Sequence, residues 1–314
     1  MNILITQVSK IGSMCWIKCL KKIKTKNIVI YGTDIFPYGY SAGSVLVDKF
    51  IEVTDEINSP TYINYIRSIC TKYHIDLLLS VMDDELFALI KSEQFKNEII
   101  SPTIDVFSLF NDKLLASNNI NKLGIEIPPI IENPFGQKKV IIRDRVNIGS
   151  RGIYVVDLKQ AAYIENRFQE SRFMQEYIEG DEYTVDVLTN KIGEPILIIP
   201  RKRIEIRQGV SFKCQLTNDQ QIIQICQKIY KQYKIPGVSN VQFIKNDSGI
   251  YFIELNTRIG GTTIASIIGG FNFVELFLDH YLDNKEVESL SHYQSLCAWG
   301  SIISRDYSEF VYLP

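Results

Sequence analysis

The first hundred residues alternate between strand-like and helix-like segments, and this rhythm constrains the fold more than any other feature of the chain. Strand-like runs occur at NILIT, NIVIYGTD, DKFIEVT and IDLLLSV, and helix-like stretches lie up to about Lys24 and from Pro60 to Tyr73. Strands that alternate with helices favour a parallel sheet covered by helices on its faces. We therefore expect an α/β domain, with ligands near the carboxyl ends of its strands.

The rhythm changes after Pro102. Residues 103–123 read as a helix that ends at GIEIPP, a two-stranded ribbon follows over 138–156, and residues 158–168 read as another helix. From FMQEYI onward, strands follow one another through short turns, with a helix at 219–233 between them, which indicates an antiparallel sheet. The chain is thus predicted to combine an α/β domain with an α+β domain.

Composition excludes several classes of protein. With 314 residues, 46% hydrophobic residues and a net charge of −2, the chain resembles globular proteins and carries no basic surplus for nucleic acid. Its apolar runs are shorter than the roughly 18 residues of a membrane span. Six cysteines and three histidines are scattered without a Cys-x-x-Cys pair, so we expect no zinc site and a reducing, cytoplasmic location. The turn TQVSKIGSM also lacks the G-x-G-x-x-G of dinucleotide-binding domains.

The segment SNVQFIKNDSGIYFIELNTRIGG is the strongest candidate for a site. NDSG reads as a hairpin turn, which places Gln242 roughly opposite Glu254. Because side chains alternate along a strand, Glu254, Asn256 and Arg258 share one face. Carboxylate and amide oxygens suit Mg²⁺, and a guanidinium beside them suits charge on a transferring phosphoryl group. The alternative is a polar row that only faces solvent.

This segment resembles the magnesium and phosphate site of the ATP-grasp superfamily, in particular of its carbamoyl-phosphate-synthase-like ligases. The family pattern N-x-Q-F, a turn and then E-x-N-x-R matches Asn240, Gln242, Phe243, Glu254, Asn256 and Arg258. The resemblance implies that Glu254 and Asn256 are metal ligands and that Gln242 contacts metal or phosphate. It also implies that Arg258 stabilises the acyl-phosphate step.

Two further segments are similar to the nucleotide site of the same family. MQEYIEGDEYTVDVL resembles the hinge, where backbone groups of Glu176, Tyr177 and Ile178 would bind the adenine edge and Glu182 would accept the ribose hydroxyls. The dipeptide Asp112-Lys113 resembles the Asp-Lys pair of the family, in which the lysine reaches the ATP phosphates. Without the resemblance, Glu182 reads as a turn residue and Lys113 as a solvated lysine.

The ribbon KVIIRDRVNIGSRGIYVV admits two interpretations. It is either an exposed hairpin with turn residues at its tip or a loop whose N–H groups close over phosphates. The resemblance favours the second, because the family's lid loop matches Gly149, Ser150, Arg151 and Gly152. Arg143 stands where the family has lysine. The planar guanidinium of arginine presents its charge and its donors differently from the compact ammonium of lysine. Arg143 either holds the α- and β-phosphates bidentately or weakens the site.

The substrate side offers weaker candidates. Arg201, Arg203 and Arg207 share a face if the strand PRKRIEIRQG alternates regularly, and could clamp a carboxylate or form a solvated basic face. Asp84 and Glu85 follow the strand IDLLLSV and would either meet an amine or cap the next helix.

The resemblance implies a pre-ATP-grasp domain at 1–102, an ATP-grasp domain at 103–285 with its lid at about 116–174, and a short C-terminal segment at 286–314. It implies an ATP-dependent carboxylate–amine ligase that uses Mg²⁺, with Mn²⁺ as the alternative metal, and small-molecule substrates. A nucleotide-binding protein that acts through partners and a carbamoyl-phosphate-type phosphoryl transfer stay open as alternatives. The oligomeric state stays open, with a homodimer the commonest choice.

Overall fold

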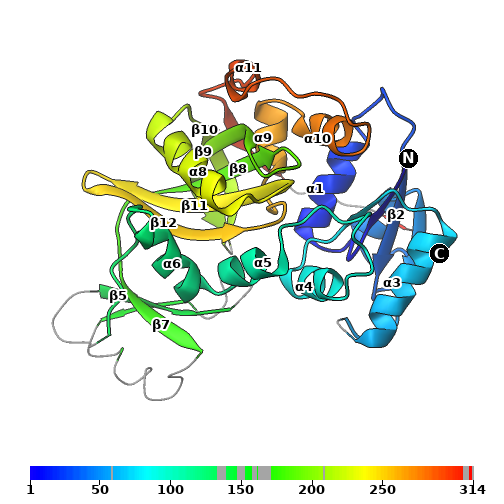
Figure 1. Cartoon of the computed structure of the whole chain (residues 1–314), viewed down its shortest axis with the longest axis horizontal. Coiled ribbons are helices and arrows are strands. Elements are labelled where there is room, and N and C mark those ends of the chain that lie inside the picture. Colours follow the sequence, from blue (N-terminus) through cyan, green and yellow to red (C-terminus); the bar gives the residue numbers. More distant parts are fainter. Residues whose placement is uncertain are drawn as a thin grey trace.

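The computed structural model describes residues 1–57, 59–132, 139–146, 153–157, 161, 171–207, 209–306 and 311–312. The described strands form three sheets (Figure 1): a four-stranded sheet near the N-terminus, a three-stranded sheet that projects from the body, and a six-stranded sheet. Gly149, Ser150, Arg151 and Gly152 lie outside the described residues, as does the helix expected at 158–168 apart from Ala161.

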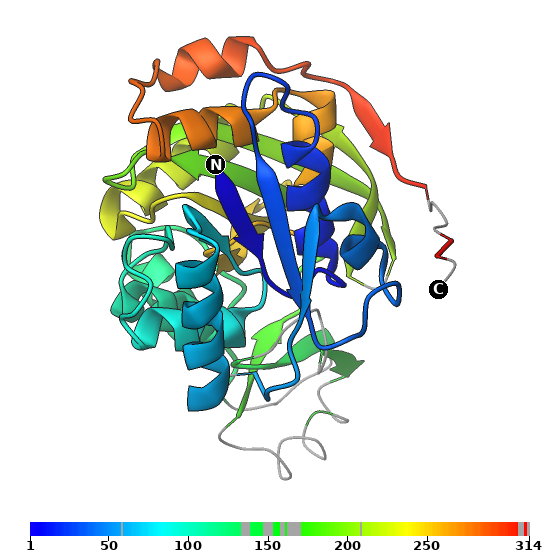
Figure 2. The same ribbon diagram turned by 90° about the vertical axis from the view of Figure 1, so that its right-hand side faces the viewer.

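The N-terminal sheet is entirely parallel, as predicted, with the order β3-β2-β1-β4. Its strands are β1 (Asn2–Ile5), β2 (Val29–Asp34), β3 (Lys49–Glu52) and β4 (Leu77–Leu79). The helices that connect and follow them are α1 (Ile11–Leu20), α2 (Ala42–Leu46), α3 (Pro60–Lys72) and α4 (Asp83–Lys91). Figure 2 shows α1 and α3 on opposite sides of this sheet.

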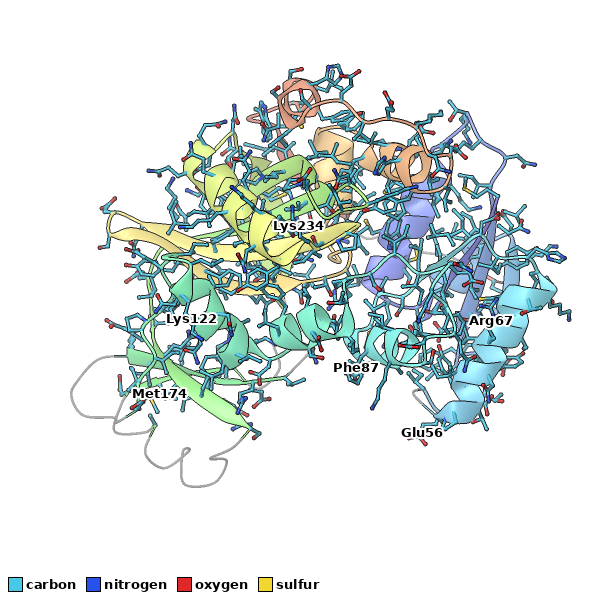
Figure 3. All side chains as sticks on the ribbon, viewed as in Figure 1. Glu56, Arg67, Phe87, Lys122, Met174 and Lys234 are labelled. Atoms are coloured by element: carbon cyan, nitrogen blue, oxygen red, sulfur yellow. The ribbon has the colours of Figure 1, made fainter. Side chains whose placement is uncertain are left out.

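The helix predicted over 103–123 is in fact two helices, α5 (Ile104–Asn111) and α6 (Lys113–Lys122). Asp112 separates them in an extended conformation, and its carboxylate accepts hydrogen bonds from the backbone N–H groups of Leu114 and Leu115. Aspartate competes with helical hydrogen bonding in this way and caps the helix that follows it. Lys113 therefore becomes the first residue of α6. In Figure 3, Phe87 of α4 lies beside α5, where its ring contacts Phe107.

The other two sheets are antiparallel, as predicted. The three-stranded sheet has the order β6-β5-β7, and the six-stranded sheet has the order β12-β11-β8-β9-β10-β13. The smaller sheet consists of β5 (Lys139–Asp144), β6 (Tyr154–Asp157) and β7 (Arg172–Glu176). The larger sheet consists of β8 (Asp181–Thr189), β9 (Pro195–Arg207), β10 (Val210–Leu216), β11 (Val238–Asn246), β12 (Gly249–Asn256) and β13 (Ile302–Ser304). The remaining helices are α8 (Gln220–Tyr233), α9 (Ile264–Gly269), α10 (Phe273–Tyr281) and α11 (Leu290–Ser295).

The two faces of the six-stranded sheet have different partners. Val185 and Val187 of β8 point toward α8, with which they form one buried cluster. The opposite face contributes Leu197 and Ile199 to a second cluster, which also contains residues of α10, α1 and the N-terminal sheet. Helix α1 lies between the two sheets (Figure 1), and its Trp16 ring is 5.5 Å from the ring of Phe277 on α10.

Candidate active site

A cleft of about 700 Å³ lies between the three-stranded sheet and the face of the six-stranded sheet that is not covered by α8. Residues from β5 to β12 line it, together with Lys113 and the turn that follows Arg258. A volume of this size is in the range of sites for small molecules, roughly 300–1,000 Å³. The position of Met174 in Figure 3 shows how far the smaller sheet projects from the body.

Two rungs of the large sheet, separated by one residue pair, place polar side chains along the floor of the cleft. In one rung Gln242 pairs directly with Glu254, as the hairpin predicted. Two residues away along β11, Asn240 pairs with Asn256 on one side and with Asp186 on the other, whereas the intervening pair of Val241 and Leu255 points to the opposite face. Directly paired residues of an antiparallel sheet point to the same face. The side chains of both rungs therefore meet on one surface.

The oxygen atoms of this surface fit a hard cation. The Asn256 amide donates through Nδ2 to Glu254 Oε1 at 3.2 Å and to Asn240 Oδ1 at 3.3 Å, which leaves its carbonyl oxygen as the donor atom for a metal. Among the described residues, no three His, Cys, Asp or Glu side chains gather closely enough to hold a metal by themselves. One carboxylate and amide oxygens suit Mg²⁺, which usually completes its coordination with water and substrate phosphates.

Arg143 of β5 reaches across the cleft to the same carboxylate. Its side chain donates to Glu254 Oε2 at 3.3 Å and to the carbonyl oxygen of Ile253 at 3.3 Å, and the residue is only 4% exposed. Burial lowers the pKa of Arg143, and Glu254 opposes that effect. Its Nε atom has no hydrogen-bond partner in the described part of the chain. A buried guanidinium with spare donor capacity is suited to a phosphate oxygen.

Lys113 lines the cleft from the start of α6, where its backbone N–H is bonded to the carbonyl oxygen of Arg145 at 2.8 Å. Burial lowers the pKa of its ammonium group; Glu254 acts to raise that pKa, while the charge of Arg143 lowers it further. The structure thus brings Lys113, Arg143 and Glu254 together, as expected of a phosphate and metal site.

The lowered pKa of Lys113 predicts how nucleotide affinity depends on pH. The free protein loses this proton at lower pH than an ordinary lysine, whereas bound phosphates favour the charged form. We therefore expect the affinity for Mg·ATP to fall as pH rises through the pKa of Lys113, by at most about tenfold per pH unit for a single proton. Calorimetric titration between pH 7 and 10 measures this, and Lys113→Arg is the control that should flatten the dependence. If the affinity for Mg·ATP depends on pH equally in wild type and in Lys113→Arg, Lys113 does not contact the phosphates.

The segment after β7 borders the cleft with Glu176, Tyr177 and Ile178, whose role as a hinge for adenine stays a prediction. The backbone N–H of Ile178 makes no hydrogen bond within the described residues, so it remains available to a ligand. The sequence interpretation missed Gln175, which is 1% exposed and also lines the cleft. Its Nε2 donates to the carbonyl oxygen of Pro128 at 3.1 Å, and its Oε1 has no partner among the described residues. A glutamine directly after the apolar residues Phe173 and Met174 was the feature of the sequence that could have indicated this position.

Glu182 borders the same end of the cleft, but it is paired with a cation. Its Oε2 accepts a hydrogen bond from Arg203 at 2.8 Å, and Arg203 also donates to the carbonyl oxygen of Gly209 at 2.7 Å. Burial lowers the pKa of Arg203, and Glu182 opposes this. Arg203 therefore lies beside the hinge and holds Glu182, whose predicted role at the ribose stays a prediction.

The three arginines of β9 do not share a face, which corrects the prediction. Arg203 pairs with Cys214 and Glu205 pairs with Lys213, so Ile204 is an extra residue in β9. Such a bulge shifts the alternation of side chains by one residue. Arg207 accordingly points away from the cleft, where its guanidinium lies over the ring of Phe212 and pairs with Glu205.

Arg201 faces the interior and is not a surface clamp. It is 0% exposed and donates through Nε to Asp186 Oδ2 at 2.8 Å. Its Nη2 donates to Thr262 Oγ1 at 3.0 Å, and the hydroxyl of Thr263 donates to Asp186. Thr262 lines the cleft, so Arg201 supports the wall of the site from behind.

Arg258 lies at the edge of the cleft and is held by a residue that the sequence interpretation left out of the site. Its Nε and Nη2 atoms donate to the two carboxylate oxygens of Asp83, at 2.8 and 2.6 Å. Burial would lower the pKa of Arg258, but the Asp83 carboxylate outweighs it and that pKa is raised.

The neighbours of Asp83 do not reach the cleft, which corrects the predicted substrate contacts of Asp84 and Glu85. Asp84 is exposed in the first turn of α4, and Glu85 is buried in the N-terminal domain. Neither side chain caps α4, because Met82 occupies the N-cap position.

Two family models match separate parts of the chain. Residues 169–298 match the family model described as "ATP-grasp in the biosynthetic pathway with Ter operon", and residues 3–103 match "PylC-like, N-terminal domain". The chain is 23% identical over 316 residues to tyramine–L-glutamate ligase of Methanocaldococcus jannaschii, an alignment that covers 91% of the chain and 94% of that protein.

Other similarities cover less of the relatives or extend only to the fold. D-alanine–D-alanine ligase of Fusobacterium nucleatum is 26% identical over 163 residues, which is 45% of this chain and 57% of that ligase. The chain therefore matches less than two thirds of this relative. The biotin carboxylase domain of the Hydrogenobacter thermophilus 2-oxoglutarate carboxylase, solved with MgADP, ADP and bicarbonate, has a TM-score of 0.74 at 17% identity, covering 92% of this chain and 71% of that one.

Proposed function

Because this chain belongs to the ATP-grasp superfamily, we propose that it is an ATP-dependent ligase that activates a carboxylate as an acyl phosphate and joins it to an amine, releasing ADP and phosphate. One observation carries the proposal. Glu254 and Asn256 offer oxygen ligands within a cleft that is also lined by the cationic side chains of Lys113, Arg143 and Arg258.

Each group of residues in the cleft suits a different part of Mg·ATP. The backbone of Ile178 and the Oε1 atom of Gln175 would bind the adenine edge. Lys113 and Arg143 would hold phosphate oxygens, and Mg²⁺ held by Glu254 and Asn256 would neutralise their charge. Arg258 would donate hydrogen bonds to the transferring phosphoryl group. Phosphoryl transfer depends mainly on such positioning and electrostatic stabilisation.

The test is ADP release with Mg·ATP and a panel of carboxylates, each supplied with and without amines. The ligase proposal predicts release that requires both partners. Replacing the amine with hydroxylamine should trap the activated carboxylate as a hydroxamate. If the protein binds nucleotide but no pair yields ADP or hydroxamate, the ligase proposal is rejected.

Two alternatives have distinct outcomes in the same assay. Arg143 pairs with Glu254, the carboxylate proposed to bind the metal, and this pairing competes with metal binding. It therefore favours the first alternative, a nucleotide-binding protein that works through partners. That protein would bind ATP without turnover. A carbamoyl-phosphate-type enzyme would release ADP with bicarbonate in place of an organic carboxylate.

The position of Arg143 gives a further prediction. Its fork spans the Ile253 carbonyl oxygen and the Glu254 carboxylate, and a lysine cannot keep both contacts and also reach a phosphate. We expect Arg143→Lys to weaken Mg·ATP binding about tenfold, or about 1.4 kcal/mol. Calorimetry measures the change, and Arg145→Lys, outside the cleft, is the control. A gain in affinity would mean that the arginine compromises the site.

We keep the finer expectations as part of this proposal: Mn²⁺ as a substitute metal, a homodimer, and a cytoplasmic location. Within the described residues, no helix is both long and apolar enough to cross a bilayer.

A further inference from the structure

Three consecutive acidic residues begin α4, and their side chains take three different directions. Asp83 pairs with Arg258, Asp84 is exposed, and Glu85 is 0% exposed. Successive residues of a helix are separated by about 100° around its axis, so one turn can serve several surfaces. The first turn of α4 thus touches the N-terminal sheet and the ATP-grasp core together.

Glu85 fixes this turn to the N-terminal domain. Its carboxylate accepts hydrogen bonds from Thr6 Oγ1 and Ser80 Oγ, each at 2.6 Å, and from the hydroxyl of Tyr62. Thr6 follows β1 and Ser80 follows β4, so the bonds fasten α4 to the carboxyl ends of two neighbouring strands. Asp83, two residues away, is consequently held in place.

Asp83 in turn fixes the plane of the Arg258 guanidinium. The contact is bidentate and joins residues 175 positions apart. A third bond runs from Arg258 Nη1 to the carbonyl oxygen of Ile259 at 3.3 Å. Among the described residues these bonds use three of the five N–H groups of Arg258, which leaves two for a ligand.

We propose that Asp83 is a positioning residue: it holds Arg258 so that the unused edge of the guanidinium faces the transferring phosphoryl group. This inference rests on the proposed ligase function. An ion pair is a poor device for merely joining two domains, because burying both charges costs about as much as their attraction returns. Its bidentate geometry does, however, restrict the many rotamers of arginine to one orientation.

The test compares Asp83→Asn with Asp84→Asn. Both variants remove one charge from the same turn of α4, but only Asp83 contacts Arg258. We expect Asp83→Asn to lower kcat about 10- to 100-fold, the cost of misplacing a reacting group, with KM for ATP changed less than about twofold. Asp84→Asn should leave both constants near wild type, and Asp83→Glu should recover part of kcat. In a protein that already carries Arg258→Gln, Asp83→Asn should cause no further loss.

A second measurement does not depend on turnover. Hydrogen exchange of the peptide 256–263 should accelerate in folded Asp83→Asn and stay unchanged in Asp84→Asn. Equal kcat in Asp83→Asn and wild type, or equal losses in the two asparagine variants, would overturn the proposal. If Asp83→Asn does not fold, Asp83→Glu decides through the same two readouts. If no substrate pair supports ADP release in wild type, the ligase function fails, and the exchange experiment still decides whether Asp83 holds Arg258.

Discussion

Glu254→Gln is expected to reduce ADP release about 100-fold or more while the protein stays folded. Glu254 is the carboxylate in the polar surface formed by the two rungs, and it faces Arg143, Asn256 and the cleft. An amide of the same shape keeps the packing but loses the negative charge that would hold Mg²⁺. Losing about 3 kcal/mol of metal-assisted charge stabilisation corresponds to roughly 100-fold in rate.

The measurement is the rate of ADP release as a function of Mg²⁺ concentration, with the unfolding temperature as a check of integrity. Glu205→Gln is the matched control, because Glu205 lies in the same sheet and contacts Arg207 outside the cleft. Turnover near wild type in folded Glu254→Gln, at ordinary Mg²⁺ concentration, would rule out the metal assignment.

Arg258→Gln is expected to lower kcat about 10³-fold, at the lower end of the effects known for arginines that stabilise phosphoryl transfer. ATP affinity should change less than about threefold, because Lys113, Arg143 and the hinge would still bind the nucleotide. Arg258→Lys keeps a positive charge but loses the planar guanidinium that Asp83 binds at two atoms. Its kcat should therefore lie between that of wild type and that of Arg258→Gln.

Rapid-quench measurement of ADP formation separates this effect on chemistry from one on product release. Arg67→Gln is a suitable control, because Arg67 of α3 pairs with Glu98 and does not line the cleft. Figure 3 shows Arg67 at the other end of the molecule from Met174 of the three-stranded sheet. If Arg258→Gln weakens ATP binding as strongly as it slows turnover, Arg258 binds the ground state and its assigned role is wrong.

Local patterns in the sequence were sufficient to predict much of the fold. The alternation of the first hundred residues predicted a parallel sheet, and the NDSG turn set the pairing of Gln242 with Glu254. Both depend on interactions between residues close in the chain, where periodicity and turn chemistry are informative. The row of Glu254, Asn256 and Arg258 could be predicted for the same reason.

Features that depend on contacts between distant segments could not be predicted. The bulge at Ile204 reverses the direction of Arg207, and regular alternation gives no sign of it. The choice among Asp83, Asp84 and Glu85 depends on Arg258, which lies 175 residues from the aspartate it contacts. Asp112 interrupts a continuous helical pattern partly because its carboxylate also pairs with Arg145. In each case the direction or the backbone conformation of one residue depends on a contact that the local sequence pattern does not contain.

Helix α1 belongs to the N-terminal topology, yet its buried face packs into the same apolar cluster as α10 and the large sheet. The proposed boundary near residue 102 therefore divides the chain by topology and not by folding unit. A fragment that ended there would expose the Trp16 side of α1 to water, and the remaining chain would lose the surface that covers Phe277. Apolar burial is the main driving force of folding, so the two halves should fold cooperatively and neither should be a good candidate for expression alone.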